Sequence, residues 1–327
     1  MSRFFVPLPL RVKQDIQRRQ LLLPGQRLLL ALSGGQDSWC LWHLLNSWQQ
    51  EMNWHIHILH CNHRWSEEET HCALALHHYF QQRGIPFAVA TAETVTRQEA
   101  QARAWRYQQY AIWAEHWDCE RVVTGHTGSD WAETVLLNLL RGSGHGGLSS
   151  LAWQRPLSGS RMVVRPLLRV WRQETAAYCQ AYGLPVWADG SNQDRRYKRN
   201  RLRLEVMPYL RQHFNPQVEG ALVHHAMLSG LEHDWVVCCA QAQWQQVYQG
   251  EPPRLHRQRL ATLHGAVQGQ LLWEFLRQHL PTTPGFEHVE WLKGLITAPQ
   301  RSRTPPFPGG WWVEVRGDWL VLRGSRS

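Results

Sequence analysis

The feature that most constrains the fold of this chain is a short turn of small residues between an apolar run and a helical pattern. The run spans 27–32, and apolar side chains at helical spacing follow over 37–48. A strand, a glycine turn and a helix in this order can bind an anion through backbone N–H groups and the helix dipole. The turn lacks the lysine of a Walker A loop, so it is a phosphate-binding loop of another kind. Its residues are Ser33, Gly34, Gly35, Gln36, Asp37 and Ser38.

Strand and helix patterns alternate along the first 214 residues. Apolar runs predict strands at 27–32, 55–60, 86–91, 121–125 and 162–167. Helical spacing predicts helices at 37–48, 66–83, 96–117, 129–140 and 173–182. This order predicts an α/β fold with a doubly wound, mainly parallel sheet, whose ligands bind at the carboxyl ends of the strands.

The pattern changes after residue 214, where long amphipathic helices replace the strand and helix alternation. The expected elements are a helix over 218–248, continuous or broken near Gly230, a helix over 268–280, and a hairpin of 311–315 with 319–322. We therefore predict two domains, an α/β domain at 1–214 and a smaller, mainly helical domain at 215–327.

The charge balance indicates what kind of partner the chain binds. Lys and Arg number 35 against 26 Asp and Glu, a formal net charge of +9, which favours nucleic acid or an anionic membrane. No segment reaches the roughly 18 unbroken apolar residues of a spanning helix, and residues 1–10 lack the apolar stretch of a signal peptide. The seven cysteines include no C-x-x-C pair, which is typical of reduced thiols. We expect a cytoplasmic protein that binds RNA and no membrane.

The turn at 33–38 resembles the PP-loop of ATP pyrophosphatases, which split ATP into AMP and pyrophosphate to adenylate a substrate. The resemblance implies that this turn holds the departing pyrophosphate and that ATP and Mg²⁺ are the cofactors. Asp37 would be catalytic and would help to coordinate Mg²⁺ at the phosphates, because a hard cation prefers carboxylate oxygen. The ends of the second and fourth predicted strands add four expected nucleotide contacts: His60, Asn62, Gly125 and His126.

Five further stretches narrow the resemblance: H-C-N-H-R at 60–64, E-A-Q-A-R-A-W-R-Y at 99–107, the segment from T-G-H-T at 124 to G-S-G at 144, D-G-S-N at 189–192 and R-N-R-L-R at 199–203. Together they resemble tRNA(Ile)-lysidine synthases over nearly all of the first 214 residues. This family adenylates the wobble cytidine in the CAU anticodon of tRNA(Ile) and attaches free L-lysine at C2. The resemblance makes 1–214 the ATP-binding, catalytic domain.

The second domain matches this family only in size and position, and we expect it to bind tRNA. The sequence leaves the oligomeric state open, with a homodimer as one alternative.

Paired charges on two predicted helices give these stretches a consistent chemistry. Asp130 and Glu133 are i,i+3 neighbours on one helix face, able to bind the ammonium groups of lysine, orient Mg²⁺ or accept a proton from the attacking amine. The alternative is a solvated acidic face, or a salt bridge to Arg103 or Arg106. These two arginines could meet phosphate or developing negative charge, or be ordinary surface residues. We predict that Asp37, Arg106, Asp130 and Glu133 are catalytic, with Arg103 and the acidic pair contacting tRNA or lysine.

A basic strip at 195–203 is the second candidate RNA contact. It includes Tyr197, which could stack on a base, and Arg199 and Arg203, which we predict to bind tRNA. The alternative is the solvated start of a helix. The six cations of the strip are Arg195, Arg196, Lys198, Arg199, Arg201 and Arg203.

Two positions depart from the family pattern, because Ser129 stands where a first acid is frequent and Trp131 where Gln is frequent. Asp130 must then carry more of the acidic role.

Other interpretations are weaker on this sequence. A zinc site at His60 and His63 has no third ligand at a suitable spacing. The G-x-G-x-x-G match at 142–147 follows a helix rather than a strand, so we interpret it as a mobile loop near the site, or a plain linker. A tRNA thiolase would need paired cysteines, and an amidotransferase a glutaminase domain. An RNA-binding module with a relic loop would not need an intact turn at 33–38.

Overall fold

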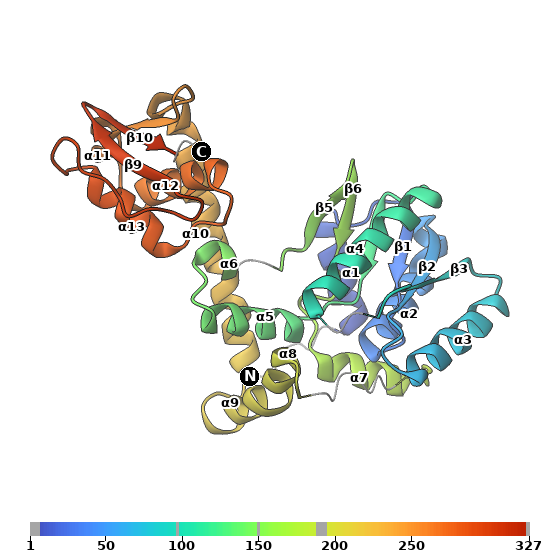
Figure 1. The fold of residues 1–327 in the computed structure, drawn as a ribbon. Coiled ribbons are helices and arrows are strands. Elements are labelled where there is room, and N and C mark those ends of the chain that lie inside the picture. Colours follow the sequence, from blue (N-terminus) through green and yellow to red (C-terminus); the bar gives the residue numbers. More distant parts are fainter. Residues whose placement is uncertain (1–6, 96–97, 149–150, 188–194, 325–327) are drawn as a thin grey trace. The chain divides into compact units, whose positions relative to one another are not determined.

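The computed structural model describes residues 7–95, 98–148, 151–187 and 195–324. The chain forms two compact units, shown as a ribbon in Figure 1. The first comprises Met1–Ser143 with Gly147–Ala226, and the second comprises Gly144–Gly146 with Met227–Ser327. Helix α10 (Val218–Val247) begins in the first unit and continues in the second. No helix in the described part of the chain is long and apolar enough to cross a membrane.

The first unit is built on a six-stranded sheet of order β3-β2-β1-β4-β6-β5. All neighbouring pairs are parallel except that of β5 with β6. The predicted doubly wound, mainly parallel sheet is confirmed, and strand order reverses at β1, where the turn at 33–38 lies. The bounds are β1 Arg27–Ala31, β2 His55–Asn62, β3 Phe87–Thr91, β4 Arg121–Thr124, β5 Gln154–Ser158 and β6 Arg161–Val164.

Strand β5 was not predicted, and the fifth predicted strand ends three residues early, at Val164. Both differences have local causes. β5 is an edge strand with Pro156 and a register shift after it, so it lacks the apolar run of a buried strand. After β6, Arg165 is followed by Pro166, which has no N–H to continue the ladder.

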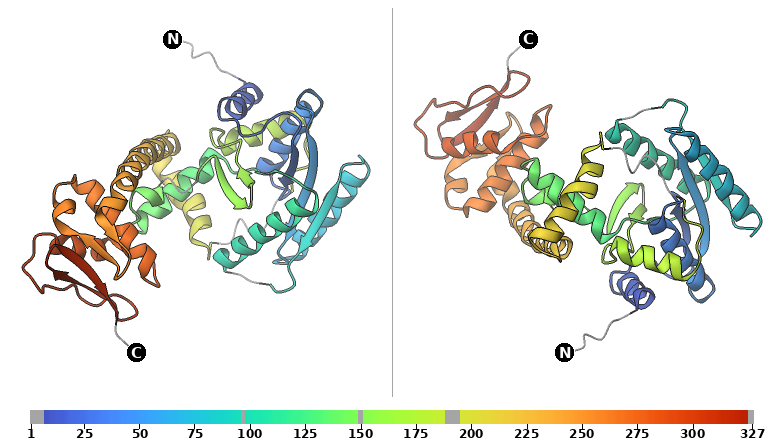
Figure 2. Two further views of the ribbon diagram at one scale, coloured as in Figure 1. Left: turned by 90° about the horizontal axis from the view of Figure 1, so that it is seen from above. Right: turned by 90° about the horizontal axis from the view of Figure 1, so that it is seen from below.

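Helices cover both faces of this sheet (Figure 2). On β1, Leu28 and Leu30 share a core with α1, α2 and α3, whereas Leu29 packs in a separate core with α4. This alternation follows from the two-residue period of a strand that is buried on both faces. The helices are α1 Leu8–Arg18, α2 Gln36–Met52, α3 Glu67–Gln81, α4 Glu99–His116, α5 Gly128–Leu140, α6 His145–Leu148 and α7 Arg172–Ala181.

Helix α1 was not predicted, because Pro7 and Pro9 interrupt the apolar pattern near its start. In the structure Pro7 is its N-cap residue and a second proline lies in its first turn, where the missing N–H does not matter. Between α7 and α10 the first unit contains α8 (Lys198–Arg201), a π-helical turn (Leu202–Val206) and α9 (Met207–His213).

The second unit combines helices with a small antiparallel sheet of order β7-β8-β10-β9. The predicted hairpin is present, with Leu320 of β10 opposite Val315 of β9. The predicted long helix is continuous through Gly230, and the helix predicted at 268–280 starts at Gly265. Helices α11 and α13 and strands β7 and β8 were not predicted. The bounds are β7 Tyr248–Gln249, β8 Arg254–His256, α11 Arg257–Ala261, α12 Gly265–His279, α13 Phe286–Leu295, β9 Trp312–Arg316 and β10 Trp319–Arg323.

Candidate active site

The turn at 33–38 joins β1 to α2 and leaves the start of that helix open. Gly35 is the N-cap residue, and no side chain of the described residues caps the helix. Its first backbone N–H groups are therefore without a capping partner, which is the arrangement that binds phosphate. The two serine hydroxyls lie beside them, with Ser33 Oγ 3.2 Å from Ser38 Oγ.

Glycine is required at two positions around this turn. Gly34 has φ +87°, and a Cβ there would lie 2.6 Å from Cys72 Sγ. Gly125, which follows β4, packs against the start of α2, because a Cβ there would lie 3.0 Å from the Ser38 nitrogen. The end of β4 thus touches the phosphate-binding turn directly.

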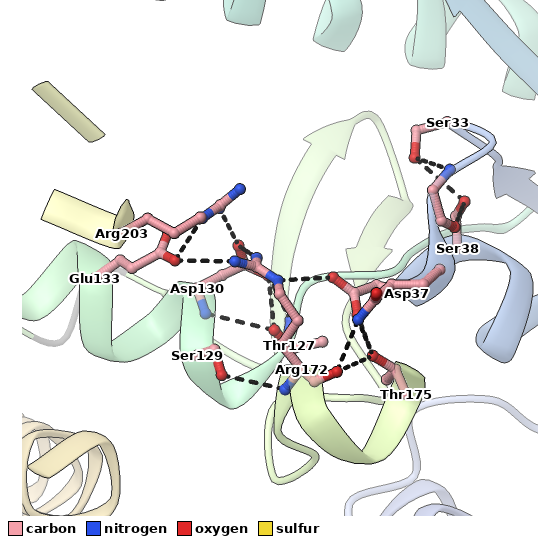
Figure 3. A network of polar contacts seen from close by, with 12 residues as sticks. Ser33, Asp37, Ser38, Thr127, Ser129, Asp130, Glu133, Arg172, Thr175 and Arg203 are labelled. Carbon is pink, nitrogen blue, oxygen red and sulfur yellow. Dashed lines mark hydrogen bonds and ion pairs between the residues drawn. The ribbon is translucent and has the colours of Figure 1, made fainter. Parts of the chain in front are cut away.

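Asp37, in the first turn of α2, is held by the start of α7. One carboxylate oxygen accepts a hydrogen bond from the Thr175 hydroxyl, and the other lies 3.5 Å from Arg172 Nε (Figure 3). Gln36 reinforces this contact by donating to the Arg172 carbonyl at 2.7 Å and to Thr175 Oγ1 at 3.0 Å. Burial raises the pKa of Asp37, as does the charge of Asp130, whereas Arg172 opposes both.

Asp130 and Glu133 lie at the start of α5, and both carboxylates are buried. Asp130 forms a capping box with Thr127, whose N–H and hydroxyl both donate to Oδ2 at 2.9 Å. Burial alone would raise the pKa of Asp130, but the cations of Arg172 and Arg199 hold it far below its usual range.

Three arginines surround this acidic pair (Figure 3 labels two of them). Arg172 donates to Asp130 Oδ1 at 2.8 Å and to Glu133 Oε1 at 3.1 Å. Arg199 and Arg203 donate to Glu133 at 3.1 Å and 2.7 Å, and each also lies 3.3 Å from Asp130 Oδ1. Asp130 and Glu133 therefore do form salt bridges, the alternative given in the sequence analysis, but their partners are arginines other than Arg103 and Arg106.

Some side chains of the basic strip at 195–203 point inward to the acidic pair, and others point outward to solvent. The side chains of Arg199 and Arg203 are 22% and 23% exposed because they turn inward to the acidic pair. The side chains of Arg195 and Arg201 are 72% and 63% exposed, and Lys198 is exposed as well. Two of the predicted tRNA contacts thus turn to buried carboxylates, whereas Arg195 and Arg201 lie at the surface, 3.7 Å and 3.9 Å from the half-exposed Glu205 carboxylate.

Arg103 contacts Tyr107 on α4, not the acidic pair. Arg103 and the buried Arg165 both donate to the Tyr107 hydroxyl, at 3.2 Å and 3.1 Å. Burial would raise the pKa of Tyr107, but these two cations hold it below its usual value. Arg106 lies on the same helix, and its Nε has no hydrogen-bond partner among the described residues. Burial lowers the pKa of Arg103, and the charges of Arg106 and Arg165 lower it further, so the predicted arginine pair forms a cationic cluster with Arg165.

Three of the predicted nucleotide contacts at the strand ends, His60, Asn62 and His126, form hydrogen bonds within the fold. His60 Nδ1 lies 2.9 Å from the Leu32 carbonyl, so it ties the end of β2 to the residue before the turn. Asn62 Oδ1 accepts the Arg64 N–H at 2.8 Å. His126 Nδ1 bonds Thr124 Oγ1 at 2.9 Å, and burial lowers its pKa to about 3, so the ring is neutral. In the described ranges, no group of three acidic, histidine or cysteine side chains could hold a metal ion.

Arg172, Thr175 and Thr127 were not predicted as site residues. Nothing in the local pattern distinguishes Arg172, which immediately precedes the helix predicted at 173–182. A usable signal was its position after the fifth strand, since the carboxyl ends of parallel strands share one edge of the sheet.

Ser129, one of the departures from the family pattern, accepts the Arg172 N–H at 3.2 Å and donates to Glu219 at 3.2 Å. The other, Trp131, is buried, and its indole N–H has no partner among the described residues. The segment 189–192 lies outside the described residues. Residues 142–147 follow α5, which ends at Leu140, and include the start of α6 at His145.

His63 gives the first unit a pH-dependent stability. The side chain is buried, and its ring stacks on that of Trp65 with the two ring centroids 4.7 Å apart. Burial lowers the pKa of His63 from 6.5 to about 4. The unfolded chain therefore binds the extra proton, and stability is lost as pH falls below about 6.5. We expect the free energy of unfolding to drop by about 2 kcal/mol between pH 7 and about pH 5 from this residue.

Urea denaturation of wild type and His63→Gln at the two pH values measures this contribution. The variant should show a drop that is smaller by that amount. Equal drops in the two proteins would contradict the assignment.

Comparison with known proteins places this site in a family. Residues 10–210 match the PP-loop domain family. The solved U34-tRNA thiolase NcsA from Methanococcus maripaludis, which holds a 4Fe-4S cluster, is similar with a TM-score of 0.55 and 17% identity, covering 66% of this chain and 76% of that chain. This likeness shows the fold alone. The first unit is thus a PP-loop domain, the fold of an ATP-using class of enzymes.

Relatives at higher identity narrow the class. A tRNA(Ile)-lysidine synthase from Synechococcus sp. is 54% identical over 319 residues, which covers 96% of this chain and 98% of the relative. Those from Gloeobacter violaceus and Nostoc sp. are 46% and 41% identical and cover 93% and 96% of this chain, and the same shares of their own lengths. The chain belongs to the tRNA(Ile)-lysidine synthase family.

Proposed function

We propose that this protein uses ATP to adenylate the wobble cytidine in the CAU anticodon of tRNA(Ile), then attaches L-lysine at C2 and releases AMP. The observation that carries the proposal is that a phosphate-binding feature and an amine-binding feature lie close together at one edge of the sheet. An uncapped helix start suited to phosphate lies beside a buried acidic pair suited to an amine, and Arg172 contacts both. Family membership supports the same reaction.

The phosphate-binding half of the site consists of the turn at 33–38. Its backbone N–H groups and the Ser33 and Ser38 hydroxyls would hold the pyrophosphate portion of ATP. Asp37 fits Mg²⁺ by its chemistry, because it is a carboxylate in the first turn of the same helix, next to those donors. When bound, the cation would neutralise charge on the phosphate oxygens. Asp37 would then exchange part of its contact with Arg172 or Thr175 for the metal.

The lysine-binding half consists of Asp130 and Glu133. Their carboxylates would hold the ammonium groups of lysine, in competition with Arg199 and Arg203. The attacking amine must lose a proton, and an acceptor next to these buried carboxylates would help. Arg103 and Arg106 would act in adenylation instead. The positive charge of their cluster would stabilise negative charge on the phosphate.

We also propose the functional division as residues 1–214 for catalysis and 215–327 for tRNA binding. The net charge of +9 supports an RNA partner for the whole chain. The compact units divide later in the chain, inside α10, so residues 215–226 belong to the first compact unit.

The first half of the reaction can be tested without lysine. The purified protein is mixed with unmodified CAU-anticodon tRNA(Ile), Mg²⁺ and ATP labelled at the α-phosphate. We expect label in the RNA and release of pyrophosphate. RNA binding without label transfer would favour a binding module instead, and sulfur incorporation in the presence of a sulfur donor would favour a thiolase.

The outward cations of the basic strip should contribute to affinity rather than to chemistry. For the triple variant Arg195→Gln, Lys198→Gln, Arg201→Gln, we expect tRNA affinity to fall by roughly 10-fold or more near physiological salt. The slope of log Kd against log salt should decrease by about 2–3, because each lost phosphate contact removes somewhat less than one unit. At saturating tRNA the turnover should stay within about 2-fold.

Filter binding over a salt series measures this effect. Arg27→Gln is the control, because Arg27 lies at the start of β1, the end of that strand opposite to the turn at 33–38. An unchanged salt slope in the triple variant would argue that RNA follows another surface.

A further inference from the structure

A single arginine, Arg172, contacts all three carboxylates of the candidate site. Its Nε lies 3.5 Å from Asp37, one terminal nitrogen lies 2.8 Å from Asp130, and the other lies 3.1 Å from Glu133. Figure 3 shows the side chain between Asp37 of α2 and the acidic pair of α5. Among the described residues it is the only cation in contact with Asp37. The guanidinium therefore spans the interval between the phosphate-binding turn and the acidic pair.

The backbone of Arg172 is fixed from both sides. Its N–H donates to Ser129 Oγ of α5 at 3.2 Å, and its carbonyl accepts from Gln36 Nε2 of α2 at 2.7 Å. The preceding residue, Trp171, packs against Gly128, where a Cβ would lie 2.6 Å from its ring. Arg172 thus enters the site from a segment docked to both helices, which restricts where the guanidinium can point.

An arginine suits this position and a lysine does not. The planar guanidinium has five N–H donors directed along separate lines, and here Nε and both terminal nitrogens have different acceptors. A lysine ammonium is a single point of charge, so it could satisfy one side of the site but not both. Arg172 is also partly exposed, with 27% of its side chain open, so it is accessible to substrate.

We propose that Arg172 is a positioning residue that couples the two halves of the reaction, holding Asp37 for ATP use and Asp130 with Glu133 for lysine. This inference rests on the proposed function. If it is correct, one substitution disturbs both half-reactions, whereas removing a contact of one partner alone disturbs one. Thr175→Val provides that comparison, because Thr175 bonds Asp37 and not the acidic pair.

The experiment measures both half-reactions in wild type, Arg172→Ala, Arg172→Lys, Thr175→Val and the control Arg169→Ala. Arg169 is an exposed arginine three residues earlier that pairs with Asp15. Adenylation is followed with labelled ATP without lysine, and lysine transfer is followed from adenylated tRNA at varied lysine. For Arg172→Ala we expect adenylation to slow by roughly 100-fold and the KM for lysine to rise by roughly 10-fold or more.

Arg172→Lys should recover at most one of the two activities, Thr175→Val should lose mainly adenylation, and Arg169→Ala should match wild type. Guanidinium ion at millimolar concentration should restore part of both activities to Arg172→Ala, a result that a merely structural role would not give. Loss of only one half-reaction, both activities within about 3-fold of wild type, or no guanidinium rescue in a folded variant would overturn the inference.

Arg172→Gln is the second variant if Arg172→Ala does not fold, and it should show the same double loss. The failure of the proposed function is distinguishable, because wild type itself would then transfer neither AMP nor lysine to RNA.

Discussion

Asp37→Ala should abolish lysine incorporation into tRNA(Ile), with a rate loss of at least about 1000-fold, while tRNA affinity stays within a few-fold. The carboxylate lies in the first turn of α2, next to the N–H groups and hydroxyls that would receive the phosphates. Without it, no carboxylate in that helical turn would hold Mg²⁺ against them. The RNA contacts proposed on the basic strip lie elsewhere, so binding should survive.

The same substitution should leave the fold nearly intact. Burial and the charge of Asp130 raise the pKa of Asp37, so its ionised form is disfavoured in the folded protein and contributes little stability. Single-turnover assays, filter binding and thermal denaturation measure the three quantities.

Asp15→Asn is the matched control, since Asp15 is a buried carboxylate of α1 that pairs with Arg169. An active Asp37→Ala enzyme would contradict the role given to this residue.

Glu133→Gln should have the second largest effect, and it should affect both lysine use and stability. The Glu133 side chain is 3% exposed and accepts from three arginines. A neutral amide of the same shape leaves those cations with too little compensating charge. We expect the free energy of unfolding to fall by about 3–5 kcal/mol, the range measured when one partner of a buried ion pair is removed.

Lysine use should fall in the same variant because the acidic pair would hold the ammonium groups. We expect kcat/KM for lysine to fall by at least about 100-fold, mostly through KM. Adenylation without lysine should fall less.

Glu219→Gln is the control for both effects, since Glu219 is a less buried carboxylate that pairs with Arg211 and touches Ser129. A Glu133→Gln enzyme with the wild-type KM for lysine would remove the acidic pair from the lysine site.

The central strands of the first unit and its phosphate-binding turn could be predicted from the sequence because each is encoded in a short, continuous stretch of residues. The apolar runs at β1, β2, β3 and β4 are long enough to identify buried strands, and the turn at 33–38 identifies itself by its glycines. The elements missed in this unit have weak local signals. β5 is an exposed edge strand interrupted by Pro156, and α1 begins at prolines that resemble an interruption.

The site was harder to predict than the fold because its contacts are tertiary. The pairing of Asp130 and Glu133 on one helix face follows from their spacing, but their partners do not. Arg199 and Arg203 come from 66 to 73 residues further along the chain. The alternative salt bridges to Arg103 and Arg106 were wrong because Arg103 bonds Tyr107 beside Arg165, and α4 packs in a separate core.

Arg172 is the site residue whose role was hardest to predict from the sequence. In the sequence it is one arginine just before the helix predicted at 173–182, with no motif around it. Its importance arises from the docking of its backbone between Gln36 and Ser129, which only the folded chain brings together.

The most direct test of the account is the ligation itself. Full-length protein is incubated with ATP, Mg²⁺, isotopically labelled lysine and unmodified CAU-anticodon tRNA(Ile), and the digested RNA is analysed by mass spectrometry. The account predicts one modified cytidine per tRNA that carries the lysine label, with one AMP released per lysine and no product when the wobble base is changed. ATP consumption or RNA binding with the wobble cytidine left unmodified would contradict it.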